Sequence, residues 1–434
     1  MEYTTAAILC VSMMLVLLML GVPIPYALLC SSVTIGLITF GGLCLDKIGW
    51  TTFHLLYNLS WTPLPLFVFL GCIIAETSIG ADLYRAARNW LSRVPGGLVV
   101  GSVFGQAVMA AALGASGPTI LAVGKVAEPE FKKYGYNKPF AVGALVCGGV
   151  LGPLIPPSAT MIIYAVIANV PLGRLFIAGI IPGIILALML AAVTVILCLR
   201  NPTLGPPAGT VSWTARFSSL TRVWPVIVVM VAILGSIYLG IATPTEAAGV
   251  GCTAILIIAI AAYGLRLKGL YRAVTEAAML NAMLMFIMVG ASFFSYVIGS
   301  SALAEQLTGL VTTLEIYPIL VIIGIQIILL ILGCFIDGIT IMLLTIPIFV
   351  PLIMALGFNP LWFGILYVVN MEIALITPPM GINLFLARNA FNVQTGDLLR
   401  GILPFMIALV IFLFILVAFP DVSLWLPGMM MKGN

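Results

Sequence analysis

Ile155-Pro156-Pro157 begins a stretch that runs to Gly179-Ile180-Ile181-Pro182, and the chain repeats this plan further on. The second copy begins at Thr377-Pro378-Pro379 and ends at Gly401-Ile402-Leu403-Pro404, so the spacing from 155 to 377 is 222 residues. Upstream, Ser116-Gly117-Pro118-Thr119-Ile120 matches Asp337-Gly338-Ile339-Thr340-Ile341 at a spacing of 221. This nearly constant offset indicates a duplicated unit. In a membrane protein, broken segments at matching places in two repeats are the best sequence indication of a transport site.

The composition places this duplicated unit in a lipid bilayer. Hydrophobic residues make up 62% of the 434 residues and charged residues only 7%, against roughly 25% charged residues in soluble domains. The start, Met1-Glu2-Tyr3-Thr4-Thr5, lacks the basic region of a signal peptide, so we expect the first apolar run to be a retained span. Eight scattered cysteines and a single histidine favour packing over metal binding or disulfides. The net charge of +4 is attributed to membrane topology rather than to nucleic-acid binding.

Apolar segments of the length needed to cross a bilayer, about 20 residues, recur along the chain. We expect spans at about 5–21, 23–42, 56–77, 138–168, 173–199, 224–240, 244–264, 278–298, 360–390 and 401–420. Two longer stretches, 97–136 and 317–357, each hold a polar turn between two apolar runs and could be re-entrant hairpins or pairs of crossings. We favour hairpins, because non-helical backbone at depth survives only when it is buried in protein or faces water.

The expected fold is an all-α polytopic membrane protein with two inverted-topology repeats, each of five spans and one re-entrant helical hairpin. Repeat 1 covers 1–200 and repeat 2 covers 223–420, with a Pro-, Gly-, Ser- and Thr-rich linker at 201–222 and a C-terminal tail at 421–434. In each repeat a broken helix follows the hairpin, at 138–168 and at 360–390.

The basic residues support this topology. With the N-terminus outside, fifteen of them fall on the inner side: Arg85, Arg88, Arg93, Lys125, Lys132, Lys133, Lys138, Arg200, Arg216, Arg222, Arg266, Lys268, Arg272, Arg388 and Arg400. Only Lys47, Arg174 and Lys432 fall outside. This bias follows the positive-inside rule and predicts that both termini are periplasmic.

Two inner segments, Ala81 to Arg93 and Leu267 to Ala278, are amphipathic and are expected to lie in the membrane interface. They would be either cytoplasmic anchors or braces that hold part of the fold fixed while another part moves. His54, in an expected outer loop with aromatic neighbours, is interpreted as structural.

The two hairpins contain polar turns, here the first hairpin turn (114–119) and the second hairpin turn (337–340). In the first, Pro118 removes an amide donor and Gly117 relaxes the backbone, so one helix ends at depth and another begins there. Free carbonyls at such a break suit a dehydrated cation, and free amides at the positive end of a helix suit a carboxylate. The second hairpin turn adds the carboxylate of Asp337.

Each broken helix contains a double proline, in the first proline break (152–158) and the second proline break (374–381). Both leave carbonyls without intrahelical partners, at several kcal/mol each in lipid. A kink healed by packing would explain one break but explains two matching breaks poorly. Hydroxyls, waters or a bound cation are the candidates to satisfy these carbonyls.

Two carboxyl groups are expected at depth, where a charge costs at least roughly 2.5–3.5 kcal/mol. Asp337 lies at a hairpin turn and is interpreted as functional. Glu372 precedes the second proline break and has no counterpart in repeat 1, where Val150 takes its place. A role at or near the site and a role in structural pairing are equally open for Glu372.

Four motifs together resemble the large membrane subunit of the TRAP (tripartite ATP-independent periplasmic) transporters, and the resemblance covers essentially the whole chain. They are Gly-Ala-Ser-Gly-Pro-Thr-Ile (114–120), Gly-Pro-Leu-Ile-Pro-Pro-Ser (152–158), Ala-Thr-Pro-Thr-Glu-Ala-Ala (242–248) and Thr-Pro-Pro-Met-Gly-Ile-Asn-Leu-Phe (377–385). The resemblance implies a sodium-coupled elevator-type carrier of the ion-transporter superfamily in a bacterial or archaeal inner membrane. It also implies a small four-helix membrane partner subunit and a periplasmic substrate-binding protein that delivers an organic acid.

Carried onto this sequence, the resemblance implies two sodium sites with the acid between the hairpin turns, and no further cofactor. The first sodium site would use Ser116, Gly117, Gly152, Pro156 and Ser158. The second would use Asp337, Gly338, Thr377, Pro379, Met380 and Gly381. Substrate contacts would come from Ser116, Thr119, Ser158, Asp337, Thr340 and Asn383. Because no Arg or Lys falls at either hairpin turn, helix amides and bound sodium would have to neutralise the acid.

The leading hypothesis is therefore sodium-driven import of a carboxylate through a tripartite system. The alternative is a stand-alone carrier of the same superfamily, coupled to sodium or, through Asp337 or Glu372, to protons. An intramembrane enzyme is disfavoured because the chain offers no metal-ligand spacing and no nucleophile–base pair. A passive channel is disfavoured because inverted hairpins indicate alternating access.

Overall fold

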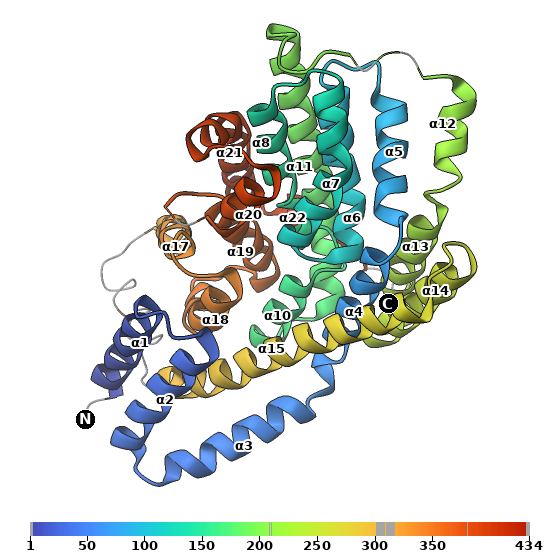
Figure 1. The fold of residues 1–434 in the computed structure, drawn as a ribbon. Coiled ribbons are helices and arrows are strands. Elements are labelled where there is room, and N and C mark those ends of the chain that lie inside the picture. The colour runs from blue at the N-terminus through green and yellow to red at the C-terminus, as the bar shows by residue number, and fades with distance from the viewer. Residues whose placement is uncertain are drawn as a thin grey trace.

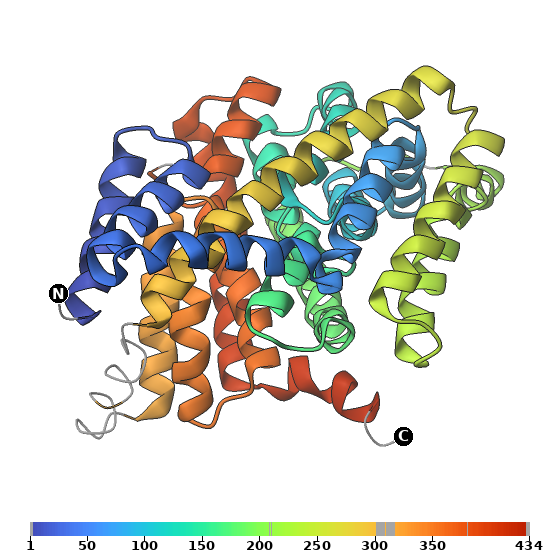
Figure 2. The ribbon, with the colours of Figure 1, turned by 90° about the horizontal axis from the view of Figure 1, so that it is seen from below.

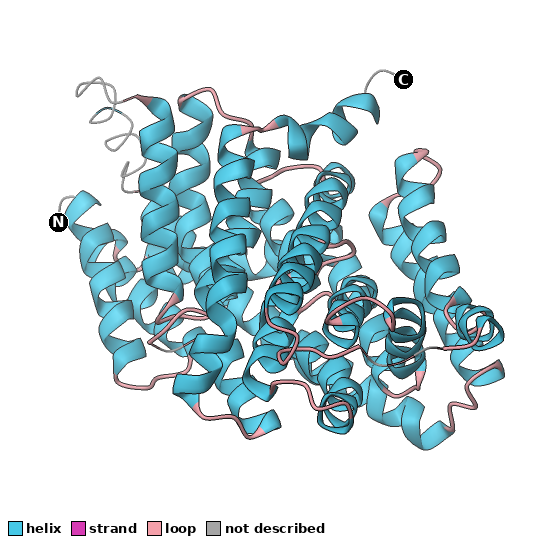
Figure 3. Ribbon diagram, turned by 90° about the horizontal axis from the view of Figure 1, so that it is seen from above, coloured by secondary structure: helices cyan, strands magenta, loops and turns pink. Residues whose placement is uncertain are grey.

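In the computed structural model the described residues are 3–207, 209, 211–300, 309, 317–379 and 381–430. Within these ranges the chain forms helices joined by short loops and no strand (Figure 3), which confirms the all-α prediction. Five of the described helices are long and apolar enough to cross a membrane, or up to eight if each bent pair is one span. Others are shorter, such as α1 (Tyr3–Met19) and α2 (Ile24–Phe40). The ten-span path stays a prediction.

One group of helices packs around the 33-residue helix α15 (Leu267–Gly299). This helix contacts α2, α3 (Leu43–Tyr57) and α4 (Pro63–Ala75), and α4 in turn contacts α14 (Pro244–Ala261), which pairs with α13 (Trp224–Tyr238). The short 3-10 helix η1 (Leu59–Trp61) joins α3 to α4, and the two are bent by 53°. In Figure 1 α15 is the long yellow helix running across the lower half of the molecule, and Figure 2 shows α3 passing across it.

The second group contains the hairpins and the broken helices, in the same order in both halves of the chain. The first half contributes α6 (Gly97–Leu113), α7 (Ser116–Lys133), α8 (Lys138–Gly148), α9 (Leu151–Leu154), α10 (Ala159–Ile167) and α11 (Leu172–Arg200). The second half contributes α17 (Pro318–Gly333), α18 (Gly338–Ala355), α19 (Pro360–Leu375), α20 (Ile382–Phe391) and α21 (Thr395–Ala418). The helix breaks fall where the sequence predicts them. Whether the two halves lie in opposite orientations across a membrane stays a prediction.

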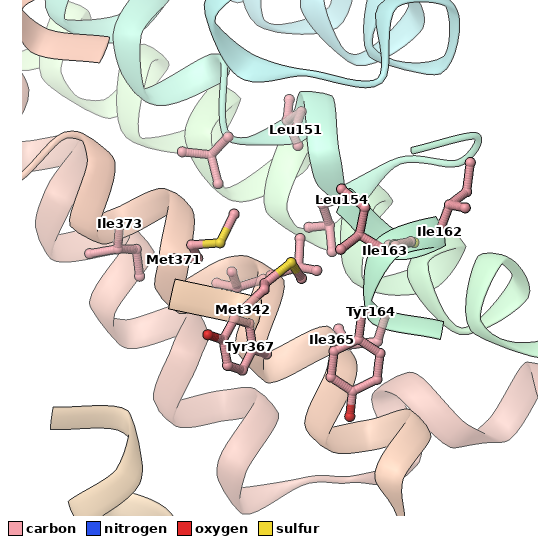
Figure 4. Packing of buried hydrophobic residues seen from close by; sticks show 14 of the residues in the cluster. Leu151, Leu154, Ile162, Ile163, Tyr164, Met342, Ile365, Tyr367, Met371 and Ile373 are labelled. Atoms are coloured by element: carbon pink, nitrogen blue, oxygen red, sulfur yellow. The ribbon is translucent and has the colours of Figure 1, made fainter. Parts of the chain in front are cut away.

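The two halves interlock rather than lying side by side. α21 packs along α8, and α11 packs against α19. In the core, Leu154 and Tyr164 of the first broken helix lie near Met342 and Tyr367 of the second half (Figure 4). The Tyr164 hydroxyl donates a hydrogen bond to the Pro360 carbonyl oxygen at 2.7 Å. These contacts hold both broken helices in one packed body.

Two sequence expectations are corrected by the structure. Leu267 to Ala278 is not a separate interfacial segment, because its helix continues without a break into the apolar part of α15. His54 lies on α3 and not in a loop, with its ring 4.0 Å from that of Trp50. Within the predicted 201–222 linker the chain forms α12 (Trp213–Leu220), and within the predicted 421–434 tail it forms α22 (Asp421–Met430), which packs against α11. The bounds of the linker and the tail stay predictions.

Candidate functional site

The first hairpin turn rests directly on the first proline break. Gly114, between α6 and α7, has φ +60°, and a Cβ there would lie 3.2 Å from the Pro157 carbonyl oxygen. A Cβ on Gly152 would lie 2.8 Å from the Ala115 carbonyl oxygen. Glycine at these two positions therefore lets the backbones of the hairpin and the broken helix meet.

The first proline break is closed off from the surface. Pro156 and Ser158 are buried, and the Pro156–Pro157 peptide bond is cis. Ser158 is the N-cap of α10, where its Oγ accepts a hydrogen bond from the Met161 amide at 3.2 Å. Its hydroxyl is thus committed to its own helix in this conformation, with its donor proton free.

The two hairpin turns start their second helices in different ways. At the second turn, the Asp337 carboxylate caps α18 and accepts from the amides of Ile339 (3.1 Å) and Thr340 (3.2 Å) and from the Thr340 hydroxyl. At the first turn the N-cap of α7 is Ala115, which has no side-chain acceptor. The first amides of a helix lack partners within the helix, so those of α7 are not capped by a side chain as those of α18 are.

The second proline break differs from the first in exposure. α19 ends at Leu375 and α20 begins at Ile382, after Gly381 with φ +44°. Thr377 donates its hydroxyl proton to the Ile373 carbonyl oxygen at 2.6 Å, and Pro378 and Pro379, joined by a cis peptide bond, are exposed. Met380 lies outside the described residues. The predicted second sodium site stays a prediction, and at its hairpin turn Gly338 lies against Met371 of α19.

Three buried polar side chains from the two halves meet at the start of α7. The Asn383 amide on α20 donates to the Ser116 Oγ at 2.9 Å, and the Glu372 carboxyl on α19 lies beside the Ser116 side chain. The three side chains belong to residues only 5%, 1% and 4% exposed for Ser116, Glu372 and Asn383. We call this group the Ser116 junction. It gives Glu372, whose role the sequence left open, a place beside the predicted site residues.

The end of α19 connects both hairpin turns. While Glu372 lies beside Ser116 of the first turn, its neighbour Met371 lies against Gly338 of the second, where a Cβ would approach the Met371 Cε to 2.4 Å. The second carboxyl oxygen of Glu372 has no hydrogen-bond partner, and Glu372 forms no ion pair among the described residues. A buried carboxylate in this state is costly unless a proton or a cation neutralises it.

The remaining predicted residues lie around this junction. Gly117 faces Asn383, whose Oδ1 would be 3.7 Å from a Cβ at position 117. Thr119 donates to the Ala115 carbonyl oxygen at 2.7 Å. Thr340 is held by Asp337, and no described contact joins it to the Ser116 junction. The structure thus unites Ser116, Gly117, Gly152 and Asn383, and no described contact joins Asp337 or Thr340 to this group.

Two glutamines escaped the sequence analysis. Gln106 on α6 and Gln326 on α17 occupy equivalent positions, and each joins the first arm of its hairpin to the following broken helix. Gln106 donates to the Leu145 carbonyl oxygen at 2.8 Å, and Asn370 donates to the Gln326 side-chain oxygen at 2.6 Å. The spacing from 106 to 326 is within one residue of the spacing between the hairpin turns, so the sequence repeat could have identified this pair.

The architecture of broken helices meeting inside an apolar helical body is that of a membrane transporter. The crystal structure of the YdaH transporter of Alcanivorax borkumensis shares this fold, with a TM-score of 0.60 and 16% identity over 87% of this chain and 89% of that chain. At this level of sequence identity, the structural likeness shows a shared fold and nothing more.

The family follows from the sequence. Residues 11–422 match the model of the tripartite ATP-independent periplasmic transporter, DctM component, and the chain belongs to this family. It is 36% identical over 367 residues to the C4-dicarboxylate TRAP transporter large permease protein DctM of Pseudomonas aeruginosa, covering 84% of this chain and 85% of that protein. It is 29% identical to the sialic acid TRAP transporter large permease protein SiaM of Vibrio cholerae, over 85% and 86%. The chain is thus a multi-pass transporter subunit and not an enzyme, and its family implies a small membrane partner and a periplasmic binding protein.

Proposed function

We propose that this chain imports a small organic acid across the inner membrane, driven by a sodium gradient. The single observation that carries the proposal is the Ser116 junction beside the uncapped start of α7. It combines amide donors at the positive end of a helix with buried oxygens in a part of the structure where helices are interrupted.

The acid would bind at the start of α7. Amides at a helix N-terminus, together with the partial positive charge of the helix dipole, favour a carboxylate. Ser116 and Asn383 are the polar side chains beside these amides, and Pro118, which is exposed, marks the open side. The P. aeruginosa and V. cholerae relatives are named for C4-dicarboxylates and sialic acid, which are acids of very different size. A helix N-terminus that contacts only the carboxylate group would bind acids of such different size.

Sodium would bind at the carbonyl oxygens that the broken helices leave free, as in other carriers with discontinuous helices. The Ala115 and Pro157 carbonyls, brought close by Gly152 and Gly114, are candidate ligands of the first ion. The cation would also offset the charge of Glu372. For the second ion, Asp337 and the second proline break would have to approach one another in another conformation, which fits an elevator-like movement.

The partners follow the family pattern. A periplasmic binding protein would deliver the acid, and a small four-helix membrane subunit would pack beside this chain, whose termini would be periplasmic. The stand-alone alternative, coupled to sodium or protons, is distinguished by the same experiment.

The test is uptake of labelled succinate or sialic acid into proteoliposomes that contain this chain with its small subunit. We expect uptake only with an inward sodium gradient and with added binding protein. Uptake that persists when choline replaces sodium would refute sodium coupling, and a pH gradient that drives it would favour the proton-coupled carrier. Uptake without binding protein would refute the tripartite mechanism. Separately, NaCl should raise the Tm of the detergent-solubilised protein above its value in choline chloride, since a ligand present at 100 times its Kd stabilises by about 2.7 kcal/mol.

A further inference from the structure

A buried arginine on α12 lacks the acceptors that its charge requires. Arg216 is 6% exposed, and its Nε and Nη2 atoms are closed off from solvent without a hydrogen-bond partner among the described residues. The guanidinium group is always charged and carries five donors in a planar fork. Leaving the N–H donors of two of its nitrogens unsatisfied in a buried place is unfavourable. We therefore expect a molecule outside this chain to supply the acceptor.

The neighbouring side chains cannot supply that acceptor. The Trp213 ring lies over the guanidinium, with its centroid 4.9 Å from Cζ, but it covers only one face and accepts nothing from the in-plane N–H groups. On the facing helix α5 (Ile79–Leu91), the acid Asp82 is already shared by Arg85 at 3.4 Å and Arg222 at 3.7 Å. Arg216 itself forms no ion pair within the described part of the chain.

The surroundings are those of a membrane–water boundary. α12 leads directly into the apolar helix α13, with a bend of 43° between them. Trp213 and Phe217 are 59% and 57% exposed, and the Phe217 ring meets that of Trp90 at 5.7 Å. Exposed aromatic rings beside an arginine at the end of an apolar helix are typical of the headgroup region.

We propose that Arg216 binds the phosphate of an anionic phospholipid, with the exposed rings of Trp213 and Phe217 against its acyl chains. Arginine pairs with phosphate through two parallel hydrogen bonds, which is what its two unsatisfied nitrogens offer. Trp213 is the side chain that would swing aside to admit the phosphate. Anionic lipid is favoured over zwitterionic lipid because Arg93, just after α5, which packs against α12, also has no ion pair among the described residues, which leaves excess positive charge. This inference does not depend on the proposed transport function.

The experiment compares the purified protein in nanodiscs of phosphatidylglycerol, in nanodiscs of phosphatidylcholine, and in phosphatidylcholine with added inorganic phosphate. Hydrogen–deuterium exchange of residues 211–223 is measured in each, and retained lipid is counted by native mass spectrometry. We expect exchange to be slowed at least about fivefold in phosphatidylglycerol only, as expected for a charge-assisted bidentate contact. Equal protection in both lipids would refute the preference for anionic lipid, and protection by inorganic phosphate alone would refute the lipid as its source.

Variants assign the effect to Arg216. Arg216→Gln should lose the protection and the retained phosphatidylglycerol, and Arg216→Lys should keep only part of both because it lacks the planar fork. Arg200→Gln, at the exposed end of α11, removes the same charge and should behave as wild type. If Arg216→Gln fails to fold, Arg216→Lys provides the second test, since loss of the planar fork should lower phosphatidylglycerol retention. Unchanged lipid retention in folded Arg216→Gln overturns the proposal.

Discussion

Substituting Ala115 by Asp tests whether the uncapped start of α7 receives the carboxylate. Ala115 is the N-cap of α7, with φ −146° and ψ 145°, and Asp337 is the N-cap of α18, with φ −67° and ψ 155°. Both backbones are extended, as an N-cap requires, and an N-cap Asp contributes about 0.5–2 kcal/mol relative to Ala. We therefore expect Ala115→Asp to fold and to keep or raise its Tm.

Transport should respond in the opposite direction. Pro118 has no N–H, so the new carboxylate would occupy the Gly117 amide proposed to hold the acid, and would place a negative charge about 4 Å from the acid. At an effective dielectric constant of about 20, that repulsion is about 4 kcal/mol, or about a thousandfold in affinity. Ala115→Asn supplies a cap without the charge, so it should weaken uptake less than Ala115→Asp does.

The assay is sodium-driven uptake of succinate or sialic acid into proteoliposomes with the binding protein, alongside the Tm of each variant. A stable Ala115→Asp protein with uptake near the wild-type rate would refute the carboxylate site at α7. Equal losses in the Asp and Asn variants would show that the amides matter and that the charge does not.

Three further substitutions test the junction, the second turn and the second break. Ser116→Ala leaves the buried Asn383 amide short of a partner, at about 1–3 kcal/mol, so it should lower both Tm and uptake. Ser32→Ala, whose hydroxyl bonds only carbonyls of its own helix, should change neither much, and equal behaviour of the two variants would contradict the junction. Asp337→Asn should keep the helix cap and the fold but weaken sodium-driven uptake. Asp337→Ala should weaken uptake and also lower the free energy of unfolding by about 1 kcal/mol, because it removes the cap. Wild-type uptake by Asp337→Asn would exclude a role for the charge. Pro379→Ala should restore a helical amide and raise the sodium concentration for half-maximal uptake, and an unchanged sodium dependence would exclude the second proline break as a cation site.

The helix breaks could be predicted because their causes are local. Pro118, Gly114 and the two double prolines disrupt helical hydrogen bonding wherever they lie, and their repetition at one offset gave both hairpins and both broken helices within a few residues. The same reasoning failed for α12 and for the start of α15. There the apolar pattern is short or mixed with charge, and only packing against α5 or continuity with the apolar part of the helix decides the structure.

The exposure of matching residues could not be predicted from their likeness. Pro156 is buried beneath the first hairpin turn, whereas Pro378, at the equivalent place, is exposed. The difference arises because the first hairpin turn packs on its own proline break, while the second packs on α19 at Met371. Similar sequences therefore meet different neighbours, and the contacts within each half determine which of the two breaks is covered.

The site itself is formed by the residues in which the two halves differ. Asp337 has no acidic counterpart at the first hairpin turn, so α18 is capped by its own carboxylate and α7 is left for a ligand. Glu372 has no counterpart in repeat 1, where Val150 takes its place, and it lies beside Ser116 across the interface between the halves. A duplicated unit would otherwise present two equivalent helix ends. Because one end is capped and the other adjoins Glu372 and Asn383, we propose that the pair of hairpins offers one carboxylate position instead of two.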